Sequence, residues 1–162
     1  MNFCFSSPSK LIFFSTFHNK QTPYFGQSIR ALQVSWFANH EGRVLAALVL
    51  ELTDLPRGVH PYVGAVIQGL RFSLSMGFLD VVMEGPPVHF MSATASVKLE
   101  NTIEDFWVED IWFLCQQHRR YLFSTVSTDT NKAAVALAKM GIGRYQHQVW
   151  IEEAPVELSG LL

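Results

Sequence analysis

The chain has 162 residues, 49% of them apolar and 16% charged, which argues against extended disorder and favours one domain with a full hydrophobic core. A formal net charge of −2 argues against a protein that holds nucleic acid through bulk positive charge, although it allows a local basic patch. The two cysteines, Cys4 and Cys115, lie far apart and form no disulfide framework, so we expect an intracellular, reducing compartment.

The first part of the chain has two interpretations. No acidic residue precedes Glu41, and serines and Lys10 lie among phenylalanines, a composition typical of an organellar transit peptide. The alternative is that residues 11–17 (LIFFSTF) form a buried first strand, and we favour it because it fits the order of elements below. Residues 1–9 are then a disordered or targeting extension. The nucleus or cytoplasm is the expected compartment, with organellar targeting as the alternative.

The next elements are a hairpin and a helix. Two apolar runs, residues 29–37 and 43–52, predict strands joined by a tight turn at residues 38–42. Residues 59–74 have apolar side chains at intervals of three and four, which predicts a helix, and Gly77 suits its carboxyl end. No apolar run is long enough to span a bilayer, so no membrane partner is expected.

Strands and helices alternate in the second half of the chain. Residues 78–83 and 121–126 predict strands, residues 102–118 and 131–140 predict helices, and a weaker helix is predicted over residues 88–97. The order of elements predicts an α/β domain with a mixed five-stranded sheet. That sheet begins with an antiparallel hairpin, continues with parallel strands and is flanked by helices.

Four short strings, taken together, resemble the plant RNase H type-1 domain of retroelement origin, which is called reverse transcriptase-like. They are HEGRVLAA at residues 40–47, QGLR at 68–71, MGFLDVVMEG at 76–85 and NKAAVALAK at 131–139. The tail at residues 149–155 is also similar to the family's C-terminal segment. The resemblance implies an RNase H-like fold over residues 10–155, with residues 156–162 as a C-terminal tail.

Active relatives hold two magnesium ions with four carboxylates, and the ions activate a water and stabilise the leaving oxygen. In this sequence the four positions carry neutral side chains, and they are Phe14, Tyr62, Pro86 and Val135. Thr125 stands where the family has a histidine. The resemblance therefore implies a domain with no metal, no cofactor and no hydrolysis by the usual mechanism. The alternative is one loosely bound metal held by Glu84 and Asp129.

The first functional hypothesis is binding of RNA or an RNA–DNA hybrid without cleavage. The fold recognises such duplexes through backbone and 2′-hydroxyl contacts, which need polar groups more than metals. The candidate residues are Arg43, Thr125, Asn131, Lys132 and Lys139. The alternative is that the two lysines are ordinary solvated helix positions and that Asn131 only supports the start of the helix.

The second hypothesis is a protein-interaction or regulatory module. The helix at residues 102–118 has apolar residues on nearly every side, which is typical of a helix that is deeply buried or covered by a partner. Its expected core stripe is Ile103, Phe106, Trp107, Ile111 and Leu114. The expected protein-interface residues are Val108, Trp112 and Phe113.

Two further interpretations complete the set. The chain is also compatible with a decayed retroelement fragment that has no selected role. Cys115 and His118, three residues apart, have the spacing of half a zinc site, but two further ligands at suitable spacing are missing, so no zinc site is predicted. The sequence does not set the oligomeric state.

Overall fold

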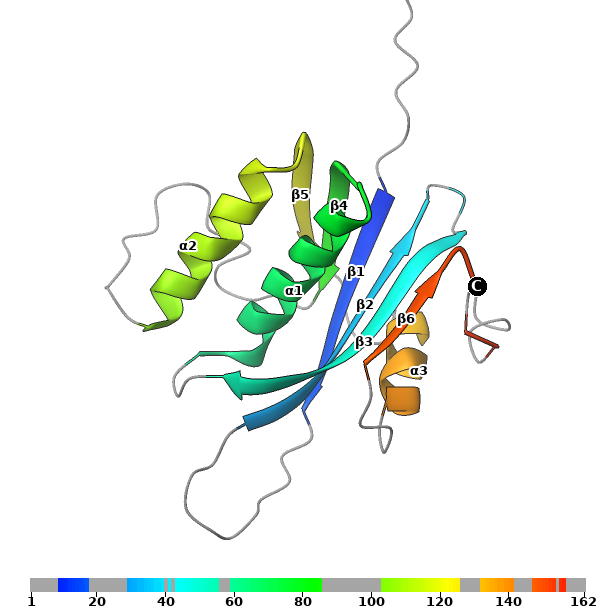
Figure 1. The fold of residues 1–162 in the computed structure, drawn as a ribbon, viewed down its shortest axis with the longest axis horizontal. Coiled ribbons are helices and arrows are strands. Elements are labelled where there is room, and N and C mark those ends of the chain that lie inside the picture. The colour runs from blue at the N-terminus through cyan, green and yellow to red at the C-terminus, as the bar shows by residue number, and fades with distance from the viewer. Residues whose placement is uncertain are drawn as a thin grey trace, which may run out of the picture.

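The structure is a computed structural model, and it describes residues 9–17, 29–39, 41, 43–55, 59–85, 103–125, 132–141, 147–153 and 155–156. In these residues a mixed sheet carries helices on its faces (Figure 1). The elements in chain order are β1 (Ser9–Phe17), β2 (Ile29–Ala38), β3 (Val44–Leu55), α1 (Pro61–Ser75), β4 (Asp80–Gly85), α2 (Ile103–Gln116), β5 (Arg120–Thr125), α3 (Lys132–Gly141) and β6 (Gln148–Ile151). The weaker helix predicted over residues 88–97 lies outside the described residues.

The sheet has six strands in the order β5-β4-β1-β2-β3-β6. The strands β1, β2, β3 and β6 are antiparallel neighbours, whereas β4 is parallel to both β1 and β5. Parallel neighbours require crossover connections, and the chain passes through α1 between β3 and β4 and through α2 between β4 and β5. The predicted mixed sheet with a hairpin start is confirmed. Its sixth strand, β6, was not predicted because four residues are too few for a periodic signal.

The turn between β2 and β3 is closed by the side chain of Asn39. Its Oδ1 accepts hydrogen bonds from the backbone N–H of Glu41 at 3.0 Å and of Arg43 at 2.9 Å. The backbone N–H of Asn39 also donates to the carbonyl oxygen of Arg43 at 3.0 Å. The hairpin prediction is therefore confirmed. Asparagine suits this position because its side chain can accept hydrogen bonds from backbone N–H groups in a tight turn.

Helices α1 and α2 pack together on one face of the sheet, and α3 lies against β1, β2 and β3 on the other face (Figure 1). The main core lies under α1 and α2, and its largest fully buried side chains are Phe37, Val63, Leu70, Met83 and Ile111. The end of α1 confirms the role predicted for Gly77, whose φ of 76° suits glycine at the residue after a helix. Among the described residues, no helix is long and apolar enough to cross a membrane.

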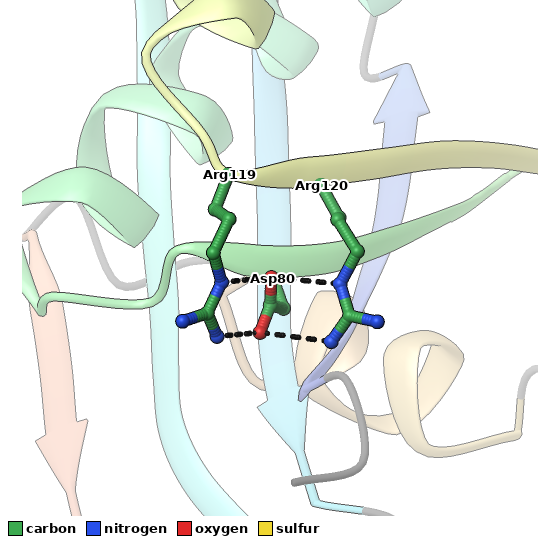
Figure 2. A network of polar contacts seen from close by, with 3 residues as sticks. All are labelled: Asp80, Arg119 and Arg120. Carbon is green, nitrogen blue, oxygen red and sulfur yellow. Dashed lines mark hydrogen bonds and ion pairs between the residues drawn. The ribbon is translucent and has the colours of Figure 1, made fainter. Parts of the chain in front are cut away.

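The start of β5 is fastened to the start of β4 by Asp80. Figure 2 shows its carboxylate between the guanidinium groups of Arg119 and Arg120. The Nε atoms donate to Oδ1 at 2.9 Å from Arg119 and 3.1 Å from Arg120. Both Nη2 atoms donate to Oδ2. The backbone N–H groups of the two arginines also share the carbonyl oxygen of Leu79, so this contact fixes which residues of β4 and β5 are neighbours.

The charge on Asp80 is essential to this contact. Its side chain is only 8% exposed, and burial alone would favour the neutral acid. Hydrogen bonds from Arg119 and then Arg120 outweigh burial and hold the pKa of Asp80 well below its usual range. The same bonds raise the pKa of both arginines, so all three groups are charged at neutral pH. A contact in which one charged carboxylate accepts hydrogen bonds from four guanidinium donors is stronger than an ordinary ion pair on the surface.

We expect Asp80→Asn to lower the free energy of unfolding by about 2 kcal/mol, because it removes the charge and turns an amide group toward the guanidinium donors. Urea unfolding followed by circular dichroism measures the change. The matched control is Asp110→Asn on the exposed side of α2, which should change stability by less than about 0.5 kcal/mol. Equal effects of the two substitutions would contradict a structural role for Asp80.

The same contact sets an acid dependence. The pKa of Asp80 is lower in the folded protein than its ordinary value of 3.8, so its stabilisation is fully present above that value and is lost as the pH falls toward the folded pKa. The stability difference between wild type and Asp80→Asn should therefore shrink as the pH is lowered below about 4. A difference that stays constant down to the lowest accessible pH would show that the charge is not involved.

Candidate functional site

The carboxyl ends of β4 and β5 lie at the same end of the sheet as the amino end of α1 (Figure 1). Gly85, the last residue of β4, pairs with Thr125, the last residue of β5. Helix α1 ends close to the start of β4 and runs back along it, so its first turn lies toward the end of β4. Phe14 lies two residues beyond the pairing of Ile12 with Glu84, which brings the middle of β1 to the same place. We call this region the candidate site.

The first turn of α1 contributes an aromatic pair to the candidate site. Pro61 is at the start of the helix, where its missing N–H costs nothing, and His60 is the N-cap. The N–H of Tyr62 donates to Nδ1 of His60 at 3.3 Å, and the two rings are stacked with centroids 5.1 Å apart and planes 11° apart. His60 was not among the predicted site residues. Its signal in the sequence is a polar side chain directly before a proline at the start of a helix.

Thr125 and Glu84 point to opposite faces of the sheet. Met83 lies in the core beneath α1 and α2, and its neighbour on β5 is Phe123. Because side chains alternate along a strand, Thr125 shares the face of Phe123, whereas Glu84 lies on the other face. Thr125 is exposed and Glu84 is half-buried. Thr125 is therefore the exposed side chain at the end of β5 on the face of the sheet that carries α1 and α2.

The described residues of the candidate site do not fit a magnesium pair. Burial raises the pKa of the Tyr62 phenol, so this side chain is neutral where the resemblance expects a carboxylate. Val135 is a half-buried apolar residue of α3. Pro86 and Asp129 lie outside the described residues. Within the described part of the chain, no group of three or more histidine, cysteine, aspartate or glutamate side chains could hold a metal ion.

The proposed nucleic-acid residues are spread over the molecule. Arg43 is exposed in the turn between β2 and β3. That turn lies at the start of β1, where Lys10 pairs with Ala38, and β1 starts beside the start of β4. Thr125 ends β5 at the other end of the sheet. The structure therefore does not bring Arg43 and Thr125 together.

The two lysines lie on α3. Lys132 and Lys139 are both exposed, and their separation of seven residues places them on the same side of the helix. Helix α3 packs against β1, β2 and β3, on the face of the sheet opposite α1 and α2 (Figure 1). Asn131 lies outside the described residues. The lysines thus form a short line of positive charge along α3.

The expected interface on α2 needs correction at Val108. This side chain is only 6% exposed and belongs to the main core, so it is not available to a partner. Trp112 is half-buried, and its ring lies against the rings of Tyr121 and Phe123 on β5 at centroid distances of 6.4 and 5.8 Å. Trp112 therefore packs within the domain, between α2 and the edge strand.

Two exposed phenylalanines lie on the outer side of α2. Phe113 is 69% exposed, as an interface residue would be, and Phe106 is 58% exposed although it was expected in the core. The expected stripe is confirmed at Ile111 and Leu114, which are buried in the main core, whereas Phe106 lies outside it. Val108 and Cys115 complete the buried side of α2. Several apolar positions around a helix permit more than one buried face, and only the packing selects it.

Cys115 and His118 have separate roles in the packing of α1 against α2. His118 follows the end of α2, and its Nε2 lies 2.7 Å from the hydroxyl of Ser73, while its Nδ1 lies 3.0 Å from the carbonyl oxygen of Leu114. Burial lowers the pKa of His118, which favours the neutral ring. Cys115 is fully buried in the main core, and burial raises the pKa of its thiol to about 12. These contacts are those of structural residues.

Comparison with known proteins supports the arrangement. The model of the reverse transcriptase-like family matches residues 35–141. The structure of RNase H1 from Halobacterium salinarum NRC-1 is similar with a TM-score of 0.66 at 15% identity, over 84% of this chain and 98% of that chain. The N-terminal RNase H domain of rv2228c from Mycobacterium tuberculosis gives 0.60 at 17% identity, over 82% and 93%.

A third similar structure, LC11-RNase H1, was solved in complex with an RNA/DNA hybrid. It gives a TM-score of 0.60 at 12% identity, over 78% of this chain and 91% of that chain. No curated protein sequence gives a match. At these identities the solved structures establish the fold.

We expect the thiol of Cys115 to be unreactive in the folded protein, because it is buried and its raised pKa leaves almost no thiolate at neutral pH. In a Cys4→Ser variant, Ellman's reagent should react with Cys115 only in denaturant, which also exposes the core. Rapid labelling of that variant under native conditions would contradict the packing of α2 described above.

Proposed function

The chain belongs to the reverse transcriptase-like family and has the RNase H-like fold, and from this premise we propose that it binds RNA or an RNA–DNA hybrid without cleaving it. The proposal rests on the candidate site and on its fold. LC11-RNase H1, which has a similar fold, was solved in complex with an RNA/DNA hybrid. Recognition of such a duplex relies on backbone and 2′-hydroxyl contacts, which polar side chains supply without a metal.

The absence of cleavage is proposed from the charge of the site. Two-metal hydrolysis needs several carboxylates to offset the charge of two divalent ions. At the start of α1 the neutral Tyr62 stands in the expected position of one of them, and Val135 in that of another. Phe14 and Pro86 are apolar by sequence at the remaining two. A site of this composition favours contact with nucleic acid over ion-assisted chemistry.

Lys132 and Lys139 supply the proposed phosphate contacts. Both are exposed on one side of α3, and two ammonium groups on one side of a helix can follow a phosphate backbone. Thr125 is the proposed hydroxyl contact at the end of β5, and Asn131 is a further proposed contact beside Lys132. Arg43 lies at the far end of the sheet and is proposed to contact only a duplex long enough to reach it.

A second candidate function rests on the outer side of α2. Phe106 and Phe113 lie two helical turns apart, and the exposed carboxylates of Glu109 and Asp110 lie between them. Large exposed aromatic residues are typical of contact surfaces, and flanking acids favour a partner of opposite charge. We therefore propose a basic amphipathic helix of a partner protein as the occupant of this surface, which we call the α2 outer face.

We expect the wild-type protein to bind a labelled RNA–DNA hybrid in the presence of EDTA, with affinity that falls as salt rises, and to leave the hybrid intact in magnesium or manganese. Lys132→Ala and Lys139→Ala should each weaken binding by about three- to tenfold and reduce the salt slope by about one. Fluorescence anisotropy at several salt concentrations measures both quantities, and gel electrophoresis detects cleavage.

The matched control removes the same charge elsewhere. Arg71 is exposed in the second half of α1, away from the first turn of that helix at the candidate site, and Arg71→Ala should bind as wild type does. No salt-sensitive complex at micromolar protein would reject the binding proposal. Metal-dependent cleavage by the purified protein would reject the proposed lack of hydrolysis.

For the α2 outer face, we expect a synthetic helix with leucines on one side and lysines on the other to bind the protein. The double variant Phe106→Ser/Phe113→Ser should weaken that binding by about tenfold, since aromatic anchors carry much of the energy of a contact. Val149→Ser on β6 is the control, because Val149 is 48% exposed but lies on another element. Isothermal titration calorimetry measures the affinities. Equal binding of a charge-reversed, glutamate-bearing peptide would refute the proposed partner chemistry.

A further inference from the structure

The stacked rings of His60 and Tyr62 form a preorganised aromatic pair at the candidate site. Their planes differ by only 11°, which is a parallel stack, and their centroids are 5.1 Å apart. The hydrogen bond from the Tyr62 N–H to Nδ1 of His60 holds the imidazole at the helix start. Because Nδ1 accepts this bond, the neutral imidazole carries its hydrogen on Nε2. The orientation of the pair is therefore set by the helix cap.

The two rings differ in exposure. Tyr62 is half-buried, and burial raises the pKa of its phenol, whereas His60 is exposed. Tyr62 therefore packs partly against the protein, and His60 is the member of the stack that is exposed to solvent. Flat exposed rings of this kind are the groups on which proteins stack unpaired nucleobases, because every base has a π-face.

The surroundings also suit a nucleic-acid strand. The first turn of α1 contains no acidic residue, so a phosphate next to a stacked base meets no carboxylate from this helix. The same end of the sheet carries the exposed hydroxyl of Thr125 at the end of β5. The start of the 15-residue helix α1 adds a favourable dipole for an anion.

We propose that the His60–Tyr62 pair is a stacking platform for one unpaired nucleobase, so that the protein prefers a duplex with a single-stranded end over a fully paired one. This inference rests on the proposed binding function and names the form of nucleic acid that the same site selects. A base inside a duplex is already stacked on both sides and offers no face to the rings. A base in an overhang offers one.

The first test compares three ligands by fluorescence anisotropy at one salt concentration: a blunt RNA–DNA hybrid, the same hybrid with a short single-stranded overhang, and that overhang with its bases removed as abasic sites. We expect the overhang to improve affinity by about tenfold, and the abasic overhang to bind like the blunt hybrid. The abasic ligand keeps the extra phosphates, so the comparison separates base stacking from charge.

Two variants separate the ring of His60 from its role as helix cap. Asn is a good N-cap, so His60→Asn keeps the cap acceptor and removes the ring. We expect it to lose the preference for the overhang and to keep its melting temperature. His60→Phe keeps a ring and removes the acceptor, so it should keep the preference while its melting temperature falls by about 3 °C.

The outcomes separate this inference from the proposed function. If the wild-type protein binds neither hybrid, both the function and the platform are rejected. If it binds blunt and overhanging hybrids equally, or if His60→Asn keeps the preference for the overhang, the platform alone is rejected and hybrid binding stands. Loss of the preference in His60→Asn together with its retention in His60→Phe supports the platform.

Discussion

The register of the edge strand β5 depends on the buried carboxylate of Asp80, which ties this strand to its neighbour β4. Strand β5 has only one neighbour among the described strands, and four of its six residues are exposed, so burial alone holds it weakly. Asp80 fixes its start by binding both Arg119 and Arg120. A slip of one residue would turn every side chain of β5 to the other face. Phe123 would then leave the core, and the end of β5 would no longer meet the end of β4.

The register of β4 and β5 connects the charged contact at one end of the sheet with the candidate site at the other end. The charged contact lies at the start of β4, and the candidate site lies at its end, where Gly85 and Thr125 are paired. Between them, the rings of Trp112 and Phe123 join α2 to β5. The polar contact that stabilises the strands is thus kept apart from the surface proposed for nucleic acid. Substitutions at Asp80 are expected to act on binding only through the fold.

The candidate site combines the geometry of an RNase H-like domain with different chemistry. In this chain the ends of the parallel strands β4 and β5 and the start of α1 converge, because crossover helices bring them to one end of the sheet. At the start of α1, a neutral phenol and an imidazole occupy that place. Aromatic rings can contact bases and sugars, but they do not offset the charge of divalent ions. This difference supports the proposed function, which is recognition of nucleic acid without ions.

The sequence by itself determined the order and type of the main elements, the hairpin at Asn39 and the end of α1 at Gly77, because these depend on local periodicity and turn chemistry. It also identified the family, because four short segments of the sequence together resemble that family. It placed Ile111 and Leu114 correctly on the buried side of α2, but apolar residues surround that helix, and only its packing puts Val108 in the core and Phe106 in solvent. Nor did it join Asp80 to Arg119, 39 residues away, or show that the exposed ring of His60 stacks on Tyr62. Tertiary structure decided these contacts, because each depends on distances and orientations that residue spacing along the chain does not specify.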